Sequence, residues 1–154
     1  MDRFVGRYEH SLDTKGRLVL PARLRQGLDS SGGYLAKGPE GCVDLWPAER
    51  FQQRLAELEE QAAGATEVAG RRARVKERVF AAAEHVAPDT QGRIPIAPYL
   101  VDFAGLDPAR VLVHGANKTI QLWNPERWAR LEAEAELELL GDEHELVGDA
   151  QAAS

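Results

Sequence analysis

Two five-residue segments of the chain combine an aspartate, a glycine and an arginine at the same spacing. Residues 13–17 are Asp-Thr-Lys-Gly-Arg, and residues 89–93 are Asp-Thr-Gln-Gly-Arg. In each segment the aspartate can accept backbone N–H bonds from the residues just after it, and the glycine permits the positive φ that a tight turn needs. The aspartate can also pair with the arginine and orient its guanidinium group, which then suits phosphate oxygens or O6 and N7 of guanine.

A single turn of this kind favours a plainer interpretation, a hairpin turn with a solvated arginine, because Asp-x-x-Gly turns are common. The duplication favours a function. Neighbouring positions such as Val19 and Pro95 differ between the two copies, whereas the arginine is present in both. Turn geometry explains the aspartate and the glycine but not the arginine. We therefore predict turn-supporting roles for Asp13, Gly16, Asp89 and Gly92, and contact roles for Arg17 and Arg93.

The two turns belong to a tandem duplication. Residues 9–10, Glu-His, recur at 84–85, and the block at 45–51, Leu-Trp-Pro-Ala-Glu-Arg-Phe, recurs at 122–128 as Leu-Trp-Asn-Pro-Glu-Arg-Trp. The turns lie 76 positions apart and the tryptophan blocks 77 positions apart, so the same order repeats at nearly the same offset. The chain therefore contains two units of about 45 residues, which favours a pseudo-two-fold pair with one core over a solenoid.

Each unit shows the same order of expected elements. An extended stretch leads into the turn, and a short apolar strand follows at residues 17–20 or 93–96. A hairpin with a Gly-containing turn is predicted over 34–46 and again over 111–123, because β-branched and aromatic residues flank the turn. A helix closes each unit.

The linking segment contains a further predicted helix over Glu67–Ala83. The fold class is therefore α+β and mainly β, with flanking helices. The predicted domain organisation is a first unit at 7–54, linking helices at 55–82, a second unit at 83–128, a C-terminal helix at 129–140 and an acidic disordered tail at 141–154.

The net charge of −6 argues against a nucleic-acid binder until its distribution is considered. Residues 132–154 contain eight acidic side chains and no lysine or arginine, so the rest of the chain has a net charge of +2. Residues 1–28 combine six basic with three acidic side chains, a net +3. Because salt screens a distant acidic tail, the local field near the first turn decides whether phosphate can bind.

No catalytic set, metal site or cofactor fingerprint is recognised in the sequence. The histidines and the single cysteine show no metal-ligand spacing, and phosphate-loop and dinucleotide motifs are missing. We therefore expect a protein that is not an enzyme and binds no cofactor. The lone Cys42, the lack of a signal peptide and the lack of a membrane span favour the cytoplasm.

The chain resembles the MraZ family of bacterial regulators. The resemblance is based on the Asp-x-x-x-Arg turns at 13–17 and 89–93, on Gly-Arg-Leu-Val-Leu-Pro at 16–21, on the two Leu-Trp-containing blocks and on the total length. It covers about residues 4–140, as two units similar to those of AbrB and SpoVT regulators.

The resemblance implies a fold, an assembly and a partner. Two AbrB/SpoVT-like units would interlock swapped hairpins into a barrel, and the chains would assemble into a ring-like homo-oligomer. The partner would be double-stranded DNA at the nucleoid, bound at short direct repeats upstream of the protein's own division and cell-wall operon, usually in repression.

The arginine of each turn is the DNA-contacting residue of the family, which implies that role for Arg17 and Arg93. Nearby cations can neutralise phosphates, and we expect this of Lys15, Arg7, Arg23 and Arg25. Because Gln91 replaces the lysine of the first turn, we expect the first unit to dominate contact with DNA.

Two alternatives stay open. AbrB-type units also serve as antitoxin-like protein-interaction modules, usually as one unit with a partner-binding tail, so the duplication argues against that function here. The acidic tail either is a solvated end of the chain or limits non-specific DNA binding.

Overall fold

The computed structural model describes residues 3–152, with side chains as far as Gly141. The chain divides into two compact parts, residues up to Asn124 and the helix that follows, and each is described by itself. The strands are β1 Phe4–His10, β2 Arg17–Val19, β3 Gly33–Lys37, β4 Val43–Pro47, β5 Glu84–Val86, β6 Arg93–Pro95, β7 Val111–Asn117 and β8 Ile120–Trp123. The helices are α1 Ala22–Arg25, α2 Ala48–Gly64, α3 Glu67–Ala81, α4 Pro98–Ala104 and α5 Pro125–Ala152.

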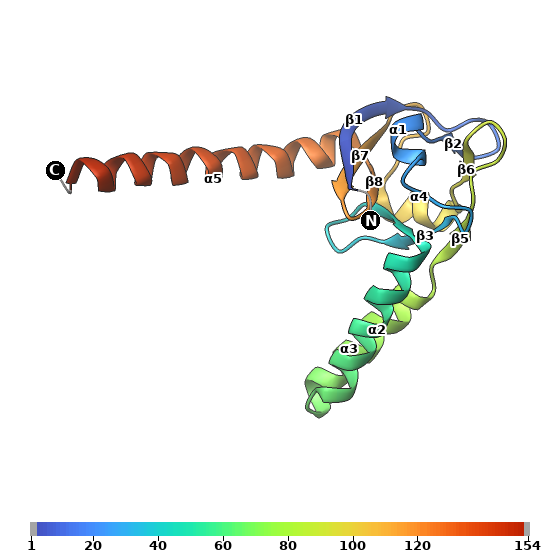
Figure 1. Ribbon diagram of the computed structural model, residues 1–154, viewed down its shortest axis with the longest axis horizontal. Helices are drawn as coiled ribbons and strands as arrows, with labels where there is room; N and C mark the ends of the chain where they lie inside the picture. Colours follow the sequence, from blue (N-terminus) through green and yellow to red (C-terminus); the bar gives the residue numbers. More distant parts are fainter. Residues whose placement is uncertain (1–2, 153–154) are drawn as a thin grey trace. The chain divides into compact units, whose positions relative to one another are not determined.

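The two units are interlocked through their strands. A six-stranded antiparallel sheet has the order β1-β7-β8-β4-β3-β5. Figure 1 labels β1, β7 and β8 of this sheet, and β3 and β5. Each hairpin, β3–β4 and β7–β8, is therefore bordered by the first strand of the other unit, since β1 pairs with β7 and β5 pairs with β3. The hairpins themselves meet through β4 and β8. Neither unit completes its sheet alone, and the expected exchange of strands between tandem units is confirmed.

A second, two-stranded ribbon joins the units at their turns. β2 pairs with β6 antiparallel, with Leu18 opposite Ile94. Backbone bonds from Leu20 N–H to Gly92 O and from Ile96 N–H to Gly16 O, both 2.9 Å, extend the ladder to each turn glycine. β1 and β5 lie at the two ends of the sheet order, and a bridge between Leu12, just after β1, and Leu18 of β2 links the ribbon to that end of the sheet.

One hydrophobic core serves both units. Leu18 and Ile94 from the ribbon are fully buried, and so are Leu45 and Leu122 at matching positions of the two hairpins. Burying large aliphatic side chains from both repeats in the same cluster stabilises the pair rather than either unit alone. The sequence-based prediction of a shared core agrees with this arrangement.

The linking helices form a hairpin with a smaller apolar cluster. α2 begins directly after Pro47, and its Phe51 stacks on Tyr34 of β3 and on Phe80 of α3, with ring centroids 4.2 and 4.7 Å apart. The helix predicted over Glu67–Ala83 is observed as α3, which ends two residues earlier.

α5 is longer in its backbone than the helix predicted over 129–140. It begins at Pro125 and extends to Ala152, and Trp128 Nε1 donates to Glu132 within it at 2.9 Å. The side chains beyond Gly141 lie outside the described residues, so the expected acidic disordered tail over 141–154 stays a prediction.

A buried carboxylate lies where the two hairpins meet. Asp44 of β4 is only 5% exposed and faces its repeat counterpart, Gln121 of β8, whose Nε2 donates to Asp44 Oδ1 at 2.9 Å. The Cys42 thiol also donates to Oδ1, at 3.4 Å. Burial outweighs these two donors and raises the pKa of Asp44 to about 6.

We expect Asp44→Asn to stabilise the protein above neutral pH. The asparagine keeps an acceptor for Gln121 but leaves no charge to desolvate. Because the pKa of about 6 in the folded protein lies above the ordinary aspartate value of 3.8, wild-type stability is expected to fall as pH rises through that window, by up to about 3 kcal/mol. Urea unfolding at about pH 4 and about pH 8 measures this, and the variant's advantage should be confined to the higher pH. An equal advantage at both values would contradict it.

Candidate nucleic-acid interface

The first turn is built by one carboxylate and one glycine. Asp13 Oδ1 accepts the backbone N–H groups of Lys15 and Arg17, both at 2.9 Å. The N–H of Gly16 donates to Asp13 O at 2.9 Å, and Gly16 has a φ of 75°. This is a tight turn followed by a left-handed residue, a conformation that favours glycine.

The same carboxylate also orients the arginine. Arg17 Nε donates to Asp13 Oδ2 at 2.8 Å, so the aspartate holds both the backbone and the side chain of Arg17. The backbone N–H of Arg17 is the main cause that lowers the pKa of Asp13 below its usual value. The carboxylate is therefore ionised at neutral pH and keeps the guanidinium group in place.

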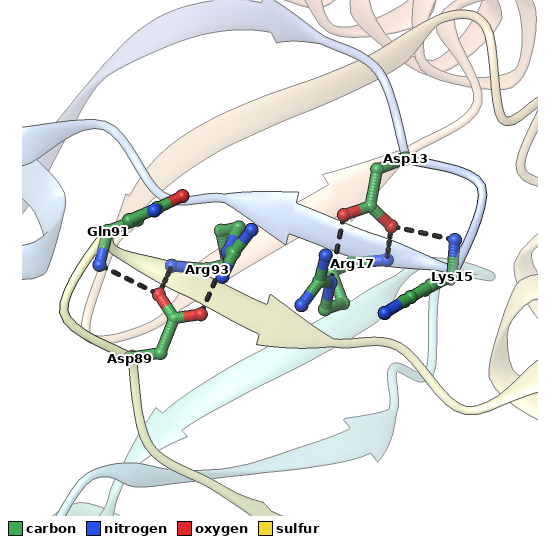
Figure 2. A network of polar contacts seen from close by, with 6 residues as sticks. All are labelled: Asp13, Lys15, Arg17, Asp89, Gln91 and Arg93. Atoms are coloured by element: carbon green, nitrogen blue, oxygen red, sulfur yellow. Dashed lines mark hydrogen bonds and ion pairs between the residues drawn. The ribbon is translucent and has the colours of Figure 1, made fainter.

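The second turn repeats this geometry. Asp89 Oδ1 accepts the N–H groups of Gln91 and Arg93 at 2.9 Å, and Arg93 Nε donates to Asp89 Oδ2 at 2.8 Å (Figure 2). Gly92 has a φ of 78°. Here too the pKa of the aspartate is lowered, chiefly by the backbone N–H of Arg93. Both units thus show the Asp–Arg pair that the sequence spacing allows.

The ribbon presents both arginines on one face. Leu18 and Ile94 are paired and fully buried, so their neighbours Arg17 and Arg93 point away from the core, because successive strand residues alternate in direction. Arg17 lies opposite Pro95, which makes it a diagonal neighbour of Arg93, about 7–8 Å away. Figure 2 shows the two Asp–Arg pairs side by side across the strands.

Each guanidinium group keeps donors available. The side chains of Arg17 and Arg93 are 29% and 27% exposed. Among the guanidinium nitrogens of these two arginines, the hydrogen bonds seen within the described residues involve only Nε, through the pairs with Asp13 and Asp89. The outer edge of each fork can therefore bind an external acceptor.

Arg25 connects the first unit to the second turn. It ends α1, and its Nη1 donates to Leu20 O at 3.0 Å while its guanidinium group lies directly against Gly92. A Cβ placed on Gly16 would meet only Ile96 O, at 3.7 Å, so the first turn has no such neighbour. The sequence indicated Arg25 as a cation but not its position, since that position depends on the pairing of β2 with β6.

The remaining predicted cations are distributed differently. Lys15 is exposed within the first turn, and Arg23 is exposed on α1 beside the ribbon strand β2 in sequence. Arg7 lies on β1 opposite His114 of β7, so it belongs to the six-stranded sheet rather than to the ribbon.

Other chemistry finds little support in the described residues. Among them, no three His, Cys, Asp or Glu side chains gather as metal ligands, and none of the helices is long and apolar enough to cross a membrane. Cys42 is fully buried, and burial raises the pKa of its thiol, which keeps it protonated and unsuited to nucleophilic attack.

The interlocked units and their paired turns define a protein of two tandem repeats that share one sheet and one core. The family model described as "MraZ protein, putative antitoxin-like" matches residues 3–72 and again 79–149. The chain belongs to the MraZ family.

Relatives named "Transcriptional regulator MraZ" cover most of the chain. One from a Nocardioides species is 41% identical over 86% of this chain and 88% of its own length. Others from Thermomicrobium roseum and Salinispora arenicola are 38% and 37% identical, over 87% and 86% of this chain and 88% and 89% of their own lengths. The protein is thus a transcription regulator and not an enzyme.

Alanine at the two turn glycines should have unequal effects. Both positions have positive φ, so each substitution is expected to cost about 1–2 kcal/mol of folding stability. Gly92→Ala must also displace the Arg25 guanidinium group, so it should cost more than Gly16→Ala. Urea unfolding of both variants measures the difference, and in an Arg25→Ala background the two costs should become equal. A difference that persists in that background would show that Arg25 is not its cause.

Proposed function

We propose that the protein is a sequence-specific DNA-binding regulator, a repressor of its own division and cell-wall operon, which binds short direct repeats in double-stranded DNA. The observation that supports this most is the ribbon face, where Arg17 and Arg93 are oriented by their aspartates and keep donors free for an external acceptor. A regulator of this kind acts at the nucleoid, in the cytoplasm.

The ribbon suits the major groove in shape and spacing. That groove admits a two-stranded β-ribbon, and an arginine fork there can bind O6 and N7 of guanine. The diagonal separation of Arg17 and Arg93, about 7–8 Å, is close to two base steps of about 3.4 Å each. Each ribbon can therefore contact two nearby guanines from one face.

The surrounding cations supply affinity that does not depend on sequence. Lys15 lies in the first turn, and Arg25 lies against the second, so both turns have an added positive charge. Arg23 and Arg7 are further candidates for phosphate contacts. From the sequence we expected the first unit to dominate contact with DNA, because Gln91 replaces the lysine of the first turn. With Arg25 beside the second turn, we propose instead that both turns contribute to DNA binding.

Assembly into an oligomer would increase the affinity for DNA beyond that of one ribbon bound to one repeat. Copies in a ring-like homo-oligomer place ribbons at fixed spacing, so binding of one direct repeat raises the effective concentration of the next ribbon at the next repeat. Specificity then depends on a few guanine contacts in each repeat and on the spacing between repeats.

Arg17→Ala and Arg93→Ala should each weaken operator binding. The expected loss is about 1–3 kcal/mol for each engaged contact, or roughly 5- to 150-fold in affinity. Gel shifts with DNA from upstream of the protein's own gene, at equal salt, measure this. Arg54→Ala is a matched control, because Arg54 is also 29% exposed and paired with an acid, Glu57, but lies on α2.

Arg17→Lys distinguishes contacts to guanine bases from contacts to phosphates. Arg17→Lys keeps the charge but loses the two-pronged donor, so preference for operator over random DNA should fall while the salt dependence stays near wild type. Operator affinity unchanged in Arg17→Ala and Arg93→Ala alike would overturn the proposed function.

Arg25→Ala should act through phosphate rather than through bases. We expect weaker binding of operator and random DNA alike, with the slope of log affinity against log salt reduced by about one for each engaged contact. If Arg25→Ala instead loses its preference for operator over random DNA while the slope of log affinity against log salt is unchanged, Arg25 does not contact phosphate.

A protein-interaction function is the second candidate, supported by the words "antitoxin-like" in the description of the matching family. It predicts that a protein encoded by a neighbouring gene co-purifies at fixed stoichiometry and that operator DNA shows no preference over random DNA.

A further inference from the structure

α3 has a row of exposed valines. Val68, Val75 and Val79 are 73%, 50% and 48% exposed, and their spacing of seven and four residues places them in one stripe. Phe80, by contrast, packs against Phe51 in the small cluster between the helices. A continuous row of exposed apolar side chains is typical of an interaction surface.

Basic side chains border this valine stripe on both sides. At about 100° per residue, Arg71 and Arg78 lie along one side and Arg72 and Lys76 along the other. All four are exposed. An apolar stripe with charged flanks is the pattern by which one helix selects a partner helix of opposite charge.

α5 has the complementary pattern. Leu137 and Leu140, 71% and 64% exposed, continue a stripe that begins at Ala133 with spacings of four and three residues. Acidic side chains border it, Glu134 and Glu138 on one side and Glu136 on the other. No lysine or arginine follows Arg130 in the sequence, so beyond that residue the described part of the leucine stripe is bordered only by acidic charge.

We propose that α5 of one copy packs along α3 of a second copy, with the leucine stripe on the valine stripe and glutamates facing arginines and lysine. This inference rests on the proposed assembly into an oligomer and names its contact. α3 against α3, or α5 against α5, would place like charges together, so the pairing joins two different surfaces. Such a heterologous contact can close into a ring.

The occupant that we propose for the valine stripe is α5 of a second copy, because its leucines and glutamates complement the valines, arginines and lysine of α3. The test must therefore distinguish pairing between copies from pairing within one chain.

Charge-swapped variants of the full chain test the contact by sedimentation velocity without DNA. Arg72→Glu with Lys76→Glu on α3 should reduce the wild-type oligomer to single copies, and so should Glu134→Lys with Glu138→Lys on α5. An equimolar mixture of the two variants should restore the oligomer, because each acidic helix then meets a basic one. A chain with all four substitutions should also assemble.

The matched control is Glu59→Lys with Glu60→Lys, two exposed acids on α2, which should leave the oligomer unchanged. The inference is overturned if the α3 and α5 variants keep the wild-type mass, if the mixture does not reassemble, or if the wild type itself sediments as one copy. Circular dichroism of each variant reports whether it is folded.

Binding to a duplex with a single repeat separates this inference from the proposed function. The affinity of the charge-swapped variants for that duplex should be within about twofold of the wild-type affinity, since the ribbon of β2 and β6 is unchanged in them. The variants should lose the additional affinity that the wild type has for DNA with several repeats. Failure of wild type to prefer the operator would count against the proposed function and leave the assembly result standing.

Discussion

The carboxylate of Asp13, with Asp89 as its counterpart, is the interaction on which the ribbon face depends. Oδ1 of Asp13 accepts hydrogen bonds from two backbone N–H groups and so shapes the turn, while Oδ2 accepts a hydrogen bond from Nε of Arg17. Exposed ion pairs contribute little to stability, so the value of this pair lies in orientation. A guanidinium group fixed in this way loses less rotational freedom when it binds, which is the benefit of preorganisation.

The interlocking of the units explains why the turns come as a pair. β2 of the first unit pairs with β6 of the second, and the same ladder reaches Gly92 and Gly16. The core beneath, formed around Leu18 and Ile94, holds that ribbon against the sheet. A duplication that began as two equal units therefore yields one surface with two arginines, and the units have since diverged in complementary ways, as Asp44 and Gln121 show.

The sequence predicted what depends on local spacing and missed what depends on strand partners. The turns at 13–17 and 89–93 were predictable because their hydrogen bonds join residues at most four positions apart. The hairpins and α3 follow from local patterns as well. The position of Arg25 against Gly92 and the burial of Asp44 depend on register between strands far apart in the sequence, which composition and periodicity do not specify.

The most direct measurement is a structure of the protein bound to a duplex that contains its operator repeats. We expect the ribbon of β2 and β6 to lie in the major groove, with the outer nitrogens of Arg17 and Arg93 within hydrogen-bond distance of O6 and N7 of two guanines about two base steps apart. A complex in which that ribbon faces away from the duplex, or is covered by another copy of the chain, would contradict it.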